Sequence, residues 1–215
     1  MEILDYYTLT ADQQSAVRAR NAFDPVPLLS EVLSLDFRLA DRKSGVAHAK
    51  EILRRAPDHP FANWVMGSNA LEFGREESAE AFLERVLRAD PDHRLALNDL
   101  AFAKYRLRKY DEAEALARRM IELEPRWGGA WDTLACVMLA RGDAAAARTA
   151  MDNAMQLDND NDPRYHLHFA QILEAQGESE RARNIVRGLL RARSSFNGRD
   201  RTELDEIAAR FRVRD

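Results

Sequence analysis

The chain has 215 residues, of which 46% are hydrophobic and 32% are charged, an ordinary composition for a helical protein. Its formal net charge is −4 and it has no block of lysine and arginine, which argues against the basic footprint of a nucleic-acid-binding protein. The single cysteine rules out an internal disulfide, and no apolar stretch approaches the ~20 residues that a membrane-spanning helix requires.

The N-terminal region, 1–59, predicts helices that lack a strong internal repeat. Thr10 and Gln13 fit a capping box, in which a hydroxyl and an amide satisfy free backbone N–H groups at a helix start. A first helix is therefore expected over residues 10–23. Helices over 28–40 and 46–56 follow as a degenerate pair without the small-residue match of the later copies. This pair should begin or cap the stack.

Residues 60–193 carry an internal repeat. Prolines recur at a constant interval at Pro57, Pro91 and Pro125, and one more step reaches Asn159 in a turn rich in Asp and Asn. A fixed period of this length, about 34 residues, indicates stacked copies of one small unit. Each copy reads as a striped helix, a short turn and a second striped helix, and the four copies span 60–93, 94–127, 128–162 and 163–193.

Small residues recur at matched places in every copy. The first helix of each copy has one such residue, namely Gly67, Ala101, Ala135 or Ala170. The second helix has another one twelve residues later, namely Ala79, Ala113, Ala147 or Ala182. Paired residues without bulk let two backbones approach closely, which predicts an antiparallel hairpin. The turn between the helices holds Gly74, Gly142 or Gly177, as a left-handed residue at a helix end would, with Arg108 in the second copy.

These offsets resemble the tetratricopeptide repeat family, in its bacterial form. The third copy matches the family pattern best, with Trp131, Leu134, Ala135, Gly142 and Ala147. The opening aromatic is replaced by Asn63 and Leu97 in the first two copies. The resemblance implies an all-α fold, a right-handed α-solenoid of antiparallel helix pairs with about 12 helices.

Residues 194–215 predict a closing helix. The stretch 194–199 breaks the preceding helix, and an apolar face then recurs at Leu204, Ile207, Ala208 and Phe211. A terminal helix with a polar outer side is what the exposed end of a solenoid requires. All three regions are expected to form one continuous domain.

Candidate metal ligands are few in the sequence. The run 158–162 begins like a calcium loop, but such a loop needs a Gly next and a Glu at its twelfth position. The chain supplies Pro163 and Phe169 there. His166 and His168 diverge by about 200° on a helix and do not converge on one ion. We therefore expect no metal and no cofactor.

Catalytic signatures are also missing from the sequence. Cys136 has only apolar sequence neighbours, Ala135 and Val137, and so reads as a small core filler without an activated thiol. No serine triad, glycine-rich phosphate loop or catalytic carboxylate pair stands out. The chain is not expected to be an enzyme.

The resemblance implies that the first helices line a concave groove and that ligands, usually peptides, lie there. The stripe opposite the small residues supplies the candidate groove residues, which are Trp64, Ser68, Leu71, Asn98, Asp99, Phe102, Tyr105, Arg106, Asp132, Thr133, Leu167 and Gln171. In the fourth copy the same stripe also holds Arg164 and His168.

Two interpretations of the groove aromatics remain open. Trp64, Phe102 and Tyr105 either present apolar surface to a ligand or pack between neighbouring first helices. Asp99 and Asp132 stand where relatives that grip acidic chaperone tails have a lysine clamp, so an acidic peptide is disfavoured. The expected ligand is a neutral-to-basic, partly apolar peptide or protein segment.

The predicted function is a non-catalytic protein-interaction scaffold. The alternative is the C-terminal region of a larger bacterial assembly, export or fused-enzyme protein, in which the stack acts as a spacer or oligomerisation surface. A homo-oligomer is compatible with either function, whereas nucleic-acid binding and membrane insertion are not expected. A cytoplasmic location is expected, or a periplasmic one if the chain is a fragment of an exported protein.

Overall fold

The computed structural model describes residues 25–38, 41–157, 162–196 and 198–213. These residues form eleven α-helices and one 3₁₀ turn, with no strand among them. The helix expected over residues 10–23 lies outside the described residues. None of the described helices combines the length and the apolar character needed to cross a bilayer.

The helices have nearly equal lengths and are separated by short turns. In chain order they are α3 (Val26–Arg38), α4 (Arg42–Arg55), α5 (Pro60–Glu72), α6 (Glu76–Ala89), α7 (Arg94–Arg106), α8 (Tyr110–Leu123), α9 (Gly128–Ala140), α10 (Ala144–Leu157), α11 (Pro163–Ala175), α12 (Ser179–Arg191), the 3₁₀ turn η1 (Arg193–Ser195) and α13 (Gly198–Arg210). The helix α4 begins four residues before the expected Val46. It begins there because the Asp41 side chain accepts a hydrogen bond from the Ser44 backbone N–H at 3.1 Å.

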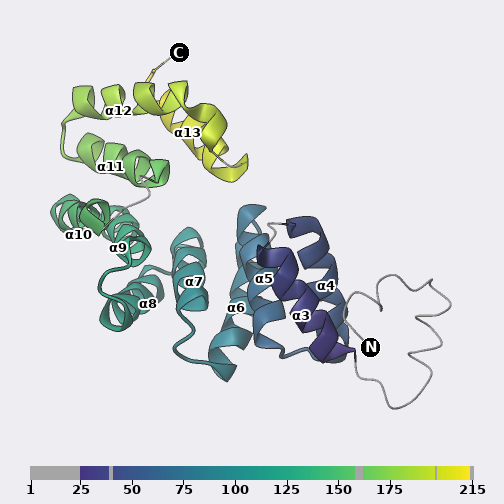
Figure 1. The fold of residues 1–215 in the computed structure, drawn as a ribbon. Helices are drawn as coiled ribbons and strands as arrows, with labels where there is room; N and C mark the ends of the chain where they lie inside the picture. Colours follow the sequence, from purple (N-terminus) through teal and green to yellow (C-terminus); the bar gives the residue numbers. More distant parts are fainter. Residues whose placement is uncertain (1–24, 39–40, 158–161, 197, 214–215) are drawn as a thin grey trace.

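Consecutive helices pack as hairpins, and the hairpins stack into an arc (Figure 1). The first helices of successive hairpins touch one another, so α5, α7, α9 and α11 line the inner wall and the second helices lie outside. The helix α13 continues this inner row and contacts α11 and α12. The expected right-handed α-solenoid of antiparallel helix pairs is thereby confirmed.

The matched small residues lie inside the hairpins, as the spacing predicts. Ala79, Ala113, Ala147 and Ala182 are all fully buried, and so are Ala135 and Ala170. Tight contact at these points brings the two helices of each hairpin together, because a small residue lets the opposite helix approach. The recurrence of small residues is therefore a packing rule.

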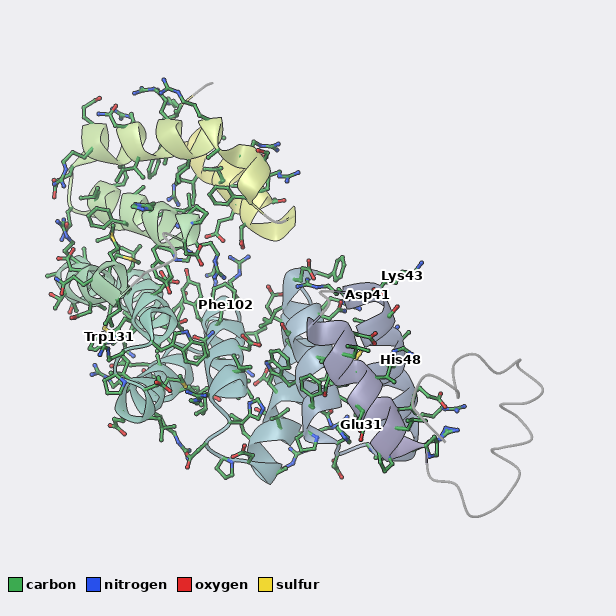
Figure 2. The ribbon with its side chains drawn as sticks, viewed as in Figure 1. Glu31, Asp41, Lys43, His48, Phe102 and Trp131 are labelled. Atoms are coloured by element: carbon green, nitrogen blue, oxygen red, sulfur yellow. The ribbon has the colours of Figure 1, made fainter. Side chains whose placement is uncertain are left out.

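The degenerate pair, α3 and α4, has a small residue at the matched place on its second helix. This match was not predicted from the sequence. Gly45 on α4 precedes Ala79 by one repeat period and is buried at the corresponding place. A Cβ there would lie 3.7 Å from Leu33 Cδ1 on α3. His48 on α4, labelled in Figure 2, bonds through Nδ1 to Asp36 Oδ2 at 2.6 Å and ties this hairpin together.

The turns inside the hairpins use the left-handed region of the backbone. Gly74, Gly142 and Gly177 have φ values of 63°, 85° and 82°, and Arg108 in the second copy has 61°. Arginine thus takes the conformation that glycine adopts in the other three turns, at a cost on the order of 1 kcal/mol. The register of the repeat outweighs the local preference at this position.

The opening position of each copy has a structural role that explains its variation. Trp131, on the left in Figure 2, donates its Nε1–H to the Pro125 carbonyl oxygen at 3.0 Å. Asn63, at the same place in the first copy, donates through Nδ2 to the Pro57 carbonyl oxygen at 2.8 Å. Asparagine therefore replaces the aromatic residue without loss of the bond that anchors the preceding turn.

Candidate functional site

The inner wall encloses a hollow of about 320 Å³. Its lining comes mainly from α5, α7, α9, α11 and α13, the helices that form the concave side in Figure 1, with Arg42 at the start of α4. The lining includes Ser68, Leu71, Asn98, Asp99, Phe102, Asp132, Thr133, Arg164, His168, Asp200 and Glu203. We call this hollow the concave groove.

The concave groove is acidic. Five carboxylates line it, those of Glu72, Asp99, Asp132, Asp200 and Glu203, against Arg42, Arg164 and His168. Burial acts to lower the pKa of His168, but the neighbouring Asp132 carboxylate outweighs it and holds that pKa well above its usual range. Carboxylates remain in excess even when His168 is protonated.

Seven of the twelve residues expected in the groove line it, namely Ser68, Leu71, Asn98, Asp99, Phe102, Asp132 and Thr133. Phe102 lies on α7 near the middle of the arc (Figure 2). Leu167 is 1% exposed and belongs to the core beneath the groove. Arg106 turns to Glu76 and Glu203, at 3.7 and 3.9 Å. Gln171 accepts a hydrogen bond from Arg210 at 3.5 Å.

Trp64 packs between neighbouring first helices, which is one of the two interpretations left open by the sequence. The side chain is 6% exposed and stacks on Phe61 with ring centroids 5.7 Å apart. Its Nε1–H donates to Asp99 Oδ2 at 3.1 Å, so the indole bridges α5 to α7. The packing interpretation holds for this residue.

Tyr105 also packs between helices, because its ring is half-buried against Phe102 and Tyr110 with centroids 5.9 and 6.4 Å away. Negative charge at the neighbouring Cys136 and burial both raise the pKa of its hydroxyl. Of the three aromatic residues singled out from the sequence, Phe102 is the one that lines the groove.

Polar contacts connect neighbouring first helices at equivalent positions. Trp64 bonds to Asp99 across α5 and α7, and Asp132 Oδ1 bonds to His168 Nδ1 at 2.7 Å across α9 and α11. Asn98 occupies the intervening position on α7, and its Oδ1 is buried without a hydrogen-bond partner among the described residues. A buried acceptor of this kind costs about 1–3 kcal/mol unless a ligand or water supplies a donor.

Asp99 should make stability depend on pH. Burial raises the pKa of its carboxyl to about 6, although hydrogen bonds from Trp64 and Asn98 act in the opposite direction. The folded state therefore holds a proton more tightly than the unfolded state. Stability from this group is greatest below the unfolded value near 3.8 and is lost as pH rises through about 6.

Asp99→Asn should therefore raise the free energy of unfolding at pH 7.5 by on the order of 2 kcal/mol, and by about half as much at pH 5. The amide keeps an acceptor for Trp64 and removes the buried charge. Urea unfolding at the two pH values measures the difference from wild type, with Asp58→Asn in an exposed turn as the control. An equal difference at both pH values would contradict a raised pKa.

Several groove residues were not among those expected from the sequence. Asp200 and Glu203 come from the helix that was expected only to cap the stack, whereas Arg164 and His168 line the groove from the stripe on which the sequence places them. The sequence does contain a feature that could have indicated them: Asp200 and Glu203 are three residues apart at the start of that helix, so both carboxylates lie on one face.

A scan against protein families matches the chain to the tetratricopeptide repeat over residues 70–135 and 138–195. No curated protein matches the sequence.

Solved structures share the arrangement of helices. A tetratricopeptide repeat protein from Parabacteroides merdae is 20% identical, with a TM-score of 0.61, over 94% of this chain and 74% of that one. The "MamA 41-end" structure from Desulfovibrio magneticus is 18% identical, with a TM-score of 0.61, over 80% and 98%. TTC0263 from Thermus thermophilus is 15% identical, with a TM-score of 0.62, over 87% and 96%. At these identities the likeness concerns the fold alone.

Proposed function

The chain belongs to the tetratricopeptide repeat family, and from this premise we propose that it is a non-catalytic scaffold that binds a peptide segment of a partner protein in its concave groove. The segment lies along the inner wall, where all the first helices from α5 to α11 can contact it.

The buried Asn98 Oδ1 is the observation that carries this proposal. An acceptor with no partner in the part of the chain that the structure describes, placed in a concave surface, suits a backbone N–H of an extended ligand. Phe102 on the next turn of α7 supplies apolar surface beside it. A polar anchor next to an aromatic contact is the usual composition of a peptide-binding groove.

The charge of the groove favours a neutral-to-basic ligand that is partly apolar. Five carboxylates against two arginines and one histidine attract a cationic side chain, and they disfavour a carboxylate. The attraction should weaken as salt is added, because part of the groove is open to solvent.

A peptide-display selection tests the proposal. A library of random peptides is selected against the full chain, and binding of the enriched peptides is measured by fluorescence anisotropy. We expect peptides with Lys or Arg next to apolar residues. Phe102→Ala should weaken their binding about tenfold or more, whereas Phe73→Ala, which removes an aromatic side chain that is 66% exposed outside the groove, should leave binding unchanged. Enrichment of acidic peptides, or equal binding by Phe102→Ala, would overturn the assignment.

A further inference from the structure

Three metal-ligating side chains meet where α9 and α11 adjoin. The Asp132 carboxylate, the Cys136 thiol and the His168 imidazole bring their ligand atoms within 4.8 Å of one another. Asp132 and Cys136 are one helical turn apart on α9 and therefore project from the same face. All three residues are at most 9% exposed.

A carboxylate stands at the other nitrogen of the His168 ring. Glu203 on α13 places Oε1 4.0 Å from His168 Nε2, whereas Asp132 bonds to Nδ1. Asp132, His168 and Glu203 also line the concave groove, so an ion can reach the cluster from the inner side of the arc. The four residues come from three successive inner helices.

We propose that Asp132, Cys136 and His168 form a zinc site between α9 and α11, and that Glu203 on α13 orients the His168 ring from its Nε2 side. Zinc is the divalent ion that takes sulfur, nitrogen and oxygen ligands in one tetrahedral site. Calcium and magnesium prefer oxygen ligands alone. A sulfur and a nitrogen ligand together with one carboxylate therefore select zinc against the alkaline-earth ions.

Zinc replaces protons in this site. The cluster now holds a hydrogen bond of 2.7 Å between Asp132 Oδ1 and His168 Nδ1. Tetrahedral ligands of zinc lie about 3.3 Å apart, given bond lengths near 2.0–2.2 Å. Entry of the ion therefore requires these two atoms to separate by about half an ångström, and it releases the protons of the Cys136 thiol and the His168 imidazole to water.

Cobalt(II) titration of the metal-free chain of 215 residues tests the site directly. Cobalt bound through a thiolate gives a sulfur-to-metal charge-transfer absorption in the near ultraviolet, and zinc should remove this band at one equivalent per chain. Cys136→Ser should abolish the band, and His168→Gln should weaken zinc binding tenfold or more. His166→Gln, which changes the neighbouring histidine on the same helix, should behave as wild type.

Glu203→Gln and thermal unfolding keep the proposal testable if the buried variants fold poorly. Glu203→Gln should keep the sulfur band but weaken zinc binding. Zinc should also raise the unfolding midpoint of the wild-type chain, whereas magnesium should not, because only a ligand of the folded state stabilises it. No sulfur band in the wild-type chain, or equal zinc binding by wild type and His168→Gln, overturns the site.

Discussion

Replacing Lys104 by methionine should lower the free energy of unfolding by about 3 kcal/mol. Lys104 lies on α7 and is 5% exposed. Its ammonium bonds to Glu84 at 2.9 Å, to Glu112 at 2.7 Å and also to Glu80. Since Glu80 and Glu84 lie on α6 and Glu112 on α8, one buried cation joins helices from two successive copies.

The pKa of Lys104 indicates that the ion cluster is favourable in the folded state. Burial acts to lower this pKa, but the hydrogen bonds that the ammonium donates to Glu112, Glu80 and Glu84 outweigh it and raise it. Removing the cation leaves three carboxylates close together, and Glu80 has little access to water. The corresponding positions in the other copies hold apolar residues, Ala70, Met138 and Leu173, so methionine fits the site. The drop in the free energy of unfolding therefore comes from the missing charge.

Lys109→Met is the matched control. Lys109 also bonds to Glu80, at 2.7 Å, but its side chain is 41% exposed, so its removal should cost less than about 1 kcal/mol. The double variant Lys104→Met with Glu80→Gln should recover part of the loss, because it removes one unpaired charge. An equal loss in Lys104→Met and Lys109→Met would refute a special role for the buried cation.

Acid should reduce the difference between wild type and Lys104→Met. Burial acts to raise the pKa of Glu80, but bonds from Lys104 and Lys109 outweigh it and hold that pKa below the usual 4.5. The stabilisation of a carboxyl with a lowered pKa is present above the unfolded value and is lost as pH falls through the folded one. Urea unfolding should therefore give a large difference in the free energy of unfolding between the two proteins at pH 7, and a small difference below pH 4.

The fold could be predicted from the sequence because its rules are local and repeat. In every copy a small residue at the same position meets the same partner helix, so one correct interpretation of Ala135 and Ala147 determines four hairpins. Register alone places Arg108 in a left-handed turn, and its φ is 61°. Periodicity carries information that the residue type at a single position lacks.

The groove could be predicted less well because residues on one helical stripe either face the groove or contact the neighbouring first helix. Trp64 and Asp99 lie on the stripe that should face a ligand, yet they bond to each other between α5 and α7. Spacing gives the face of a helix but not how far the next hairpin covers that face. The side-chain contacts between neighbouring first helices depend on the curvature of the stack.

The cluster around Cys136 could not be predicted for the same reason. Its sequence neighbours are apolar, whereas its spatial neighbours are the His168 ring and the Asp132 carboxylate on the inner wall. Glu203 reaches the same place only because the arc brings α13 to the groove. These approaches depend on the superhelix as a whole, and no offset within one copy encodes them.

The hairpin of α5 and α6 should be destabilised by alanine at position 67, although the other three copies have alanine at this place. Gly67 stands where the others have Ala101, Ala135 and Ala170, and exposed helical positions gain about 1 kcal/mol from Gly→Ala. In this structure, however, a Cβ on Gly67 would lie 2.7 Å from Leu83 Cγ and 2.8 Å from Leu83 Cδ2. Leu83 is fully buried within a core cluster, so its neighbours must shift as well.

Gly67→Ala should therefore destabilise the chain by about 1–3 kcal/mol, because overpacking outweighs helix propensity. Leu83→Ala alone should cost about 2–5 kcal/mol through the cavity it leaves. The double variant should cost clearly less than the sum, by about 2 kcal/mol, because it recreates the Ala101 and Ala117 pair of the second copy. Urea unfolding of the four proteins gives this coupling.

A control cycle with Ala170→Gly and Leu83→Ala, which combines positions from hairpins that are not neighbours, should be additive within about 0.5 kcal/mol. Additivity of the Gly67 and Leu83 changes would mean that the two helices can separate to admit the extra methyl group. Each hairpin would then be only loosely closed, and the small residues would not determine the spacing of its helices. Strong coupling instead means that the size of residue 67 is set by residue 83 across the hairpin, so that each copy keeps its own complementary pair within one common backbone.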